Sequence, residues 1–242
     1  MQAVILAAGV SRRLRPLTDN TPKCLLNIGE KNLLHRTIEN IRDNGISDYI
    51  FVTGYLENMI RDYMDKNFPD LDKTYITNPG YEVNNNSYSL WMTKDYIKED
   101  MLLLDSDILF DKKIIAKLLE SRHENCLAVN YTKDLDHEQI KVILNNENKV
   151  LEIGKEISIA ESAGESIGVE KFSPYYMKEL FSILDRKITK ENIINEFYEA
   201  SFQEIIDNGD SGNSIYAEDV SMFGCMEIDT VCDYEKAQNI LI

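Results

Sequence analysis

Glycine and proline are scarce in this chain, which has 11 glycines and 5 prolines among its 242 residues. Average usage would give about 29 of the two together, so the composition excludes a collagen-like chain and a Pro/Gly-rich disordered chain. Hydrophobic residues make up 43% and charged residues 28%, the proportions of an ordinary globular protein. A chain of this length can bury roughly 70 to 75% of its unfolded surface, so a stable core needs no disulfide.

Cysteine and long apolar runs are also rare. The four cysteines, Cys24, Cys126, Cys225 and Cys232, form no Cys-x-x-Cys pair and have no histidine nearby at zinc-finger spacing, which predicts reduced thiols in a cytoplasmic protein. The apolar stretch at residues 3–8 has no basic residue before it and is too short for a signal peptide or a membrane span. We therefore expect a cytoplasmic protein with no membrane partner.

Basic residues are outnumbered, since 26 Lys and Arg stand against 42 Asp and Glu, a net charge of −16. Affinity for nucleic acid comes largely from Lys and Arg side chains that replace condensed counterions, so the sequence predicts no nucleic-acid partner. If the chain binds an anionic substrate, the cations that hold it should be few and clustered, or supplied by a metal.

The first half of the chain alternates short apolar runs with segments of helical periodicity. Leu34, Ile38 and Ile41 recur at the spacing of one helix face, and Asn44-Gly45 follows as a C-cap signal. This β-α-β-α order predicts a doubly wound α/β fold with a mixed, mainly parallel sheet, whose ligands bind where the strands end. The expected strands are 4–6, 49–53, 74–77 and 101–104, and the other expected helices are 56–68, 87–96 and 114–119.

The second half, beyond about residue 125, has shorter strands and two further helices. No internal repeat and no Pro-, Gly- or Ser-rich linker interrupts the chain, so we expect a single domain over residues 1–242. The expected strands are 127–131, 140–144, 150–153, 166–172, 215–220 and 225–228, and the expected helices are 174–184, 193–208 and the segment from Tyr234 onward.

The loop after the first strand combines small residues with a cluster of cations. Residues 7–9 are Ala-Ala-Gly, which lets backbone N–H groups approach a ligand closely. Arg12, Arg13, Arg15 and Lys23 follow within a chain that is otherwise acidic. A solvated basic loop with alanines for helix packing is the alternative, but the combination favours a polyphosphate site.

Two acidic segments follow predicted strands. Asp105 and Asp107 come directly after the strand 101–104, where carboxylates face the ligand edge and suit Mg²⁺. Asp229 follows the strand 225–228. It would supply a second carboxylate if that strand lies beside the strand that leads to Asp107. The alternatives are helix caps, with Asp107 or Asp111 capping the helix at 114 and Asp229 capping the last helix.

One more cation comes just after a strand. Lys155 follows the strand 150–153, where a lysine is otherwise an ordinary residue of a surface turn.

The segment LAAGVSRRLRPLTDNTPKCLL, residues 6–26, resembles the signature of the sugar-phosphate nucleotidylyltransferases. Arg13 matches the signature arginine, and Arg12 is extra. The resemblance covers most of the chain and is nearest to the small cytidylyltransferase branch, which includes enzymes for phosphocholine, aminoethylphosphonate and phosphoglutamine. The further matching segments are 85–90, 105–107, 154–155, 164–168, 195–199 and 227–229.

The resemblance implies an Mg²⁺-dependent cytidylyltransferase that joins CTP to a small phosphorylated or phosphonate acceptor and releases pyrophosphate. It implies a Rossmann-like nucleotidyltransferase fold with a small β-rich insertion on the acceptor side. Residues 1–125 would form the nucleotide-binding half and residues 126–242 the acceptor-binding half. The sequence leaves the acceptor and any homo-oligomer open.

The resemblance also implies roles for individual residues. Arg13 and Lys23 would hold the triphosphate, Lys155 would meet the acceptor phosphate, and Asp107 and Asp229 would bind Mg²⁺. The expected nucleotide-binding residues are Leu6, Ala8, Gly9, Asn85, Asn86, Ser87 and Asp105, and the expected acceptor-binding residues are Tyr88, Glu170, Tyr198 and Glu199.

Helical spacing over 193–208 predicts that Phe197 and Phe202 lie in the core, which leaves Tyr198 and Glu199 as the better acceptor-pocket residues.

Three other functions remain open at this point. A sugar-1-phosphate nucleotidylyltransferase that uses UTP or dTTP has the same signature. A glycosyltransferase also uses an Asp-x-Asp pair, although it does not call for Arg13 and Lys23. A non-catalytic nucleotide sensor would not need Lys155.

Overall fold

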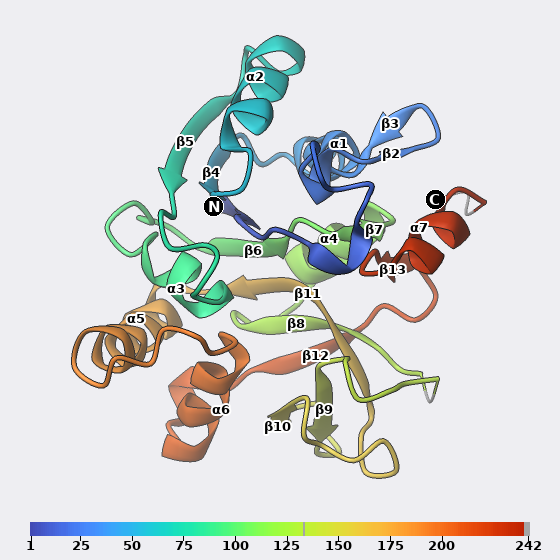
Figure 1. The fold of residues 1–242 in the computed structure, drawn as a ribbon. Helices are drawn as coiled ribbons and strands as arrows, with labels where there is room; N and C mark the ends of the chain where they lie inside the picture. The colour runs from blue at the N-terminus through green and yellow to red at the C-terminus, as the bar shows by residue number, and fades with distance from the viewer. Residues whose placement is uncertain (133, 240–242) are drawn as a thin grey trace.

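The computed structural model describes residues 1–132 and 134–239, and its centre is a nine-stranded mixed sheet (Figure 1). Along the sheet the strand order is β10-β9-β11-β6-β1-β4-β5, with β8 paired to β11 and β12 paired to β8. The strands are β1 (Gln2–Ala7), β4 (Asp48–Thr53), β5 (Asp72–Thr77), β6 (Met101–Asp105), β8 (Cys126–Asn130), β9 (Lys141–Leu144), β10 (Val150–Gly154), β11 (Gly164–Phe172) and β12 (Tyr216–Asp219).

The N-terminal half contributes four parallel strands, β5, β4, β1 and β6. β1 lies between β4 and β6, and all six of its residues are buried, as its continuous apolar run predicts for a strand covered on both faces. Leu6 is in register with Asp105, and Ala7 with Thr53. The ends of these strands therefore meet at one edge of the sheet.

Helices cover both faces of this sheet. Side chains alternate along β1, so Ile5 packs in one core with helices α1, α2 and α4, and Val4 packs in the other with α3, α5 and α6. The doubly wound α/β fold is thus confirmed. The helices are α1 (Leu33–Asp43), α2 (Glu57–Asn67), α3 (Asn86–Trp91), α4 (Lys113–Glu120), α5 (Pro174–Thr189), α6 (Glu199–Asn208) and α7 (Val231–Ala237).

β11 joins the two halves because it pairs antiparallel with β8 along one side and, on the other side, with β9 near its start and with β6 near its end. Its ladder to β8 shifts register between Ser166 and Glu170. At Gly168 the backbone is left-handed, with φ of 70°, and the strand there passes close to the Asp105 carboxylate.

Two small sheets lie outside the main one. β2 (Asn27–Ile28) pairs with β3 (Lys31–Asn32), and β7 (Ile108–Phe110) pairs antiparallel with β13 (Cys225–Glu227). The backbone N–H of Ile228 continues the second pairing by donating to the Asp107 carbonyl at 3.0 Å. This pairing, through the unpredicted strand β7, brings the C-terminal acidic segment beside Asp107.

Two helices are several residues shorter than the sequence-based expectation, whereas α5 runs on to Thr189 and α7 begins earlier, at Val231. The helix expected over 193–208 begins only at Glu199, and the one expected over 87–96 spans Asn86–Trp91. Asn192 has a left-handed backbone, with φ of 57°, and the next residues run along the start of α3. There the N–H of Tyr198 donates to Asn86 Oδ1 at 3.0 Å. Tertiary hydrogen bonds therefore replace helix in this segment.

Within residues 1–132 and 134–239, no helix has the length and apolar character that a membrane span requires.

Candidate active site

A cleft of about 310 Å³ opens where β1 and β6 end. It contains residues from the first loop, from the start of α3, from both acidic segments and from β11. The residues expected from sequence that line it are Leu6, Ala8, Gly9, Arg13, Lys23, Asn85, Asn86, Asp105, Asp107, Lys155, Glu199 and Asp229.

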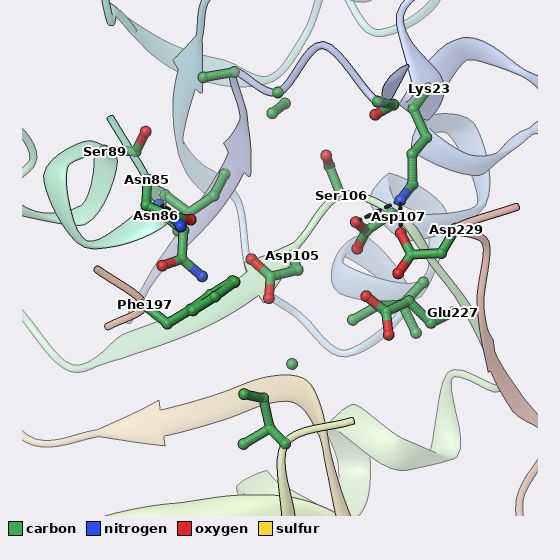
Figure 2. A pocket seen from close by; sticks show the side chains of 18 of the residues that line it. Lys23, Asn85, Asn86, Ser89, Asp105, Ser106, Asp107, Phe197, Glu227 and Asp229 are labelled. Carbon is green, nitrogen blue, oxygen red and sulfur yellow. Dashed lines mark hydrogen bonds and ion pairs between the residues drawn. The ribbon is translucent and has the colours of Figure 1, made fainter. Parts of the chain in front are cut away.

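Lys23 joins the two aspartates in this cleft (Figure 2). Its Nζ atom lies 2.8 Å from Asp107 Oδ2 and 2.6 Å from Asp229 Oδ1, and its side chain is only 8% exposed. Burial alone would lower the pKa of Lys23, but the charges of Asp107 and Asp229 raise it above its usual range. The lysine is therefore a fixed positive charge in the cleft.

Three carboxylates gather beside Lys23. Asp107, Glu227 and Asp229 each offer an oxygen, and these atoms lie within 4.8 Å of one another. Asp107 Oδ1 is buried with no hydrogen-bond partner. Burial, with the nearby charges of Asp107 and Asp229, raises the pKa of Glu227 to about 8. This oxygen-rich group, with one acceptor atom unused, fits a hard divalent cation such as Mg²⁺.

Neither aspartate is a helix cap. Thr230 caps α7, and its hydroxyl and the Asp233 carboxylate form a reciprocal capping box. The carboxylate of Asp111 accepts the N–H of Lys113 at the start of α4, at 2.9 Å. The capping alternatives for Asp107 and Asp229 are thus wrong, and both carboxylates face the cleft.

Arg13 and Lys155 add two further cations. Arg13 Nη2 lies 2.6 Å from Asp229 Oδ2. Burial raises the pKa of Asp229, but the charges of Lys23 and Arg13 outweigh it and hold that pKa below its usual range. Lys155 Nζ lies 4.3 Å from the centre of the Phe197 ring, a cation–π distance.

Asparagines form the wall of the cleft at the start of α3. Asn85 and Asn86 line it, whereas Ser87 is only 2% exposed and does not. The fully buried Asn78 follows β5 and organises this wall, because its side-chain N–H₂ donates to Asn84 Oδ1 at 2.8 Å and to Ser89 Oγ at 3.0 Å. Sequence reasoning missed Asn78, although its position at the end of a parallel strand is a signal.

Tyr198 and Glu170, which the sequence predicts to bind the acceptor, are buried beneath the cleft surface. Tyr198 is fully buried, and its hydroxyl lies 2.9 Å from Asp105 Oδ2 and 3.5 Å from Glu170 Oε1. Glu170 is 1% exposed. Burial, with the charges of Asp107 and Glu199, raises the pKa of Asp105 well above its usual range. Tyr198 and Glu170 thus lie beneath Asp105, which lines the cleft, and do not line the cleft themselves.

Phe197 lines the cleft and is 39% exposed, so the expectation that it lies in the core was wrong. The error came from helical spacing, which does not apply because the helix begins at Glu199. Tyr88 does not line the cleft, and its ring packs 5.3 Å from that of Trp91. Glu138 and Glu165 do line it. Glu165 lies in the matching segment 164–168, which gave it no expected role, and no motif in the sequence marks Glu138.

Comparison with known proteins gives consistent matches. The choline-phosphate cytidylyltransferase of Streptococcus pneumoniae is 28% identical over 100% of this chain and 98% of its own length. The CTP:phosphoglutamine cytidylyltransferase of Campylobacter jejuni is 27% identical over 97% of this chain and 98% of its own length. The solved CTP:phosphocholine cytidylyltransferase from S. pneumoniae (LicC) matches with a TM-score of 0.82 and 26% identity, over 98% of this chain and 97% of that one.

The family model described as nucleotidyl transferase matches residues 2–149, more than half of the chain. That match includes the first loop with Arg13 and Lys23 and the acidic segment with Asp107. The resemblance carried by residues 6–26 is therefore confirmed, and the chain belongs to the nucleotidyl transferase family.

Proposed function

We propose that this protein is an Mg²⁺-dependent cytidylyltransferase that joins CTP to a small phosphorylated or phosphonate acceptor and releases pyrophosphate. The observation that carries the proposal is the position of Lys23, 2.8 Å from Asp107 and 2.6 Å from Asp229. Three distant segments thus meet beside the small residues Ala8 and Gly9, which suits a metal-bound triphosphate.

The reaction needs no general base. An acceptor phosphate is already largely dianionic at pH 7, because its second pKa is about 6, so its oxygen can attack the α-phosphorus directly. Consistent with this, none of the residues described as lining the cleft is a histidine. The activation barrier arises from repulsion between the acceptor phosphate and the triphosphate, and from the negative charge that develops on the leaving pyrophosphate.

The cations of the cleft would lower that barrier. Arg13 and Lys23 bind and orient the triphosphate, and Lys155 binds the acceptor phosphate, so alignment and charge neutralisation lower the barrier together. Asp107 and Asp229, with Glu227 beside them, would hold Mg²⁺, which supplies further neutralisation of phosphate charge when bound. Loss of one such contact is expected to cost about 3 to 4 kcal/mol in the barrier.

Acidic residues in the cleft favour an acceptor whose other end is a cation. Glu199 lines the cleft, is only 6% exposed, and its Oε2 atom has no hydrogen-bond partner. Glu165 and the ring of Phe197 line the same cleft. A cationic group would balance the charge of the carboxylates and lie against the face of the ring. The primary ammonium of aminoethylphosphonate could also donate a hydrogen bond to Glu199, whereas the quaternary ammonium of phosphocholine would interact through its charge alone.

The test is to mix the protein with each nucleoside triphosphate, Mg²⁺ and a panel of acceptors, and to measure pyrophosphate. The panel contains phosphocholine, aminoethylphosphonate, phosphoglutamine and sugar 1-phosphates. We expect release with CTP and a cationic acceptor. Release only with UTP or dTTP and a sugar 1-phosphate would assign the other branch. Nucleotide binding with no release from any pair would indicate a sensor.

We further propose that the enzyme works in the cytoplasm. All four cysteines are free thiols, two of them buried, which supports a reducing compartment.

A further inference from the structure

The loop between β8 and β9 brings one more carboxylate into the cleft, between two of its cations. The Oε2 atom of Glu138 lies 3.5 Å from Arg13 Nη1 and 3.5 Å from Lys155 Nζ. A single oxygen atom thus bridges the first loop and the turn after β10. His137 Nε2 lies 3.4 Å from the other oxygen, Oε1.

The backbone that carries Glu138 is anchored by a buried lysine. Lys141 is 1% exposed, and its ammonium donates to the carbonyls of Gln139 at 2.9 Å and Asp136 at 3.2 Å. The N–H of Glu138 donates to Asp136 Oδ1 at 2.6 Å. These bonds hold the backbone of residues 136–139 against the start of β9.

The carboxylate itself is held much less tightly than the backbone. The side chain of Glu138 is 48% exposed, and its partners Arg13 and Lys155 are 54% and 29% exposed. Ion pairs this exposed contribute little stability each and are screened by salt. Rotation of the Glu138 side chain can therefore break both of these ion pairs without any movement of the backbone.

The two cations are the ones that the proposed function assigns to the substrate phosphates, so the inference rests on that assignment. A phosphate bound between Arg13 and Lys155 would meet the Glu138 carboxylate at close range, and like charges there repel strongly. We propose that Glu138 is an internal anion that occupies the phosphate-binding cations of the free enzyme and competes with its substrates. Its side chain turns away when the phosphates arrive.

The test is Glu138→Gln, which removes the charge and keeps the shape of the side chain. The matched control is Asp134→Asn, which makes the same charge change on the same loop at an exposed residue that does not line the cleft. Dissociation constants for CTP and for inorganic pyrophosphate are measured by calorimetry at low and at high salt, together with the melting temperature of each variant.

We expect Glu138→Gln to bind both ligands about three- to tenfold more tightly than wild type at low salt, as the loss of two exposed ion pairs predicts. The gain should shrink at high salt, and Asp134→Asn should match wild type.

Equal affinities in Glu138→Gln and Asp134→Asn, weaker binding in Glu138→Gln, or no binding of either ligand to any variant would overturn the inference. Failure of the proposed function is a separate outcome, because pyrophosphate binding is measured without turnover. If no acceptor is converted but Glu138→Gln still binds pyrophosphate more tightly, the competing role of Glu138 stands and the assigned reaction does not.

Discussion

Glu199 shows how one buried side chain couples stability to pH. Burial raises the pKa of its carboxyl group to about 7, against a backbone hydrogen bond and the charge of Lys155, which lower it. Because the unfolded chain loses this proton at lower pH than the folded protein, the folded state is penalised progressively as pH rises from the unfolded value to about 7.

Glu199→Gln removes that penalty. We expect the variant to gain stability relative to wild type between pH 5 and pH 8, by about 3 kcal/mol in the difference of unfolding free energies. Denaturant unfolding of both proteins at the two pH values measures it. A difference between the proteins that does not change with pH would contradict the raised pKa.

Individual residues were predictable from sequence where a motif marks them. Lys23, Asp107 and Asp229 belong to recognisable segments, and all three line one cleft. Glu138 lies in a polar stretch without a motif, so only the fold brings it there, and Glu165 lies in the matching segment 164–168, which gave it no expected role. Phe197 and Tyr198 are adjacent in sequence. Which of the two side chains faces the cleft depends on whether the backbone there is helical, and residue spacing alone did not decide this.

Among the elements, β11 packs directly against the acidic segment that lines the cleft. A Cβ atom built at Gly168 would lie 2.9 Å from Asp105 Oδ2 and 3.0 Å from Ile108 Cδ1. The backbone there is also left-handed. The glycine therefore allows the strand to approach the acidic segment closely.

Gly168→Ala tests this approach. We expect it to destabilise the protein by about 2 to 4 kcal/mol, from the left-handed backbone and the overpacking together. Denaturant unfolding provides the measurement, and Gly209→Ala is the control, because its backbone is also left-handed but no atom lies within 4 Å of the added Cβ. Equal losses in the two variants would show that close packing at Gly168 contributes nothing.

Local patterns predicted most elements because each pattern reports on its own segment. The parallel strands β1, β4 and β6 have continuous apolar runs, and α1 has a clear apolar face. The pairing of β7 with β13 joins two short strands far apart in sequence, and the loss of helix before Glu199 depends on hydrogen bonds to α3. Such long-range contacts leave little signal in any one segment.

At the scale of the whole molecule, the charge of −16 contrasts with the cations of the cleft. Arg13, Lys23 and Lys155 all line that cleft, and each has a carboxylate within 3.5 Å. The positive charge is thus local and partly neutralised, and it is too small to attract a polymer of phosphates against the overall field.

We therefore expect the protein to bind CTP but not DNA or RNA. Fluorescence anisotropy with a labelled single-stranded oligonucleotide at low salt should show no binding at protein concentrations that saturate with CTP. Binding that weakens steeply with salt would contradict this account of the charge distribution.

The most direct test of the central claim is pyrophosphate release by Asp107→Asn and Asp229→Asn with CTP, Mg²⁺ and the best acceptor. Each variant should lose turnover by about 10²- to 10³-fold while the protein stays folded, as circular dichroism at the assay temperature would show. Asp95→Asn, at an exposed residue outside the cleft, should retain full turnover. Near-normal turnover in both Asp107→Asn and Asp229→Asn would contradict the claim that these aspartates hold the catalytic metal.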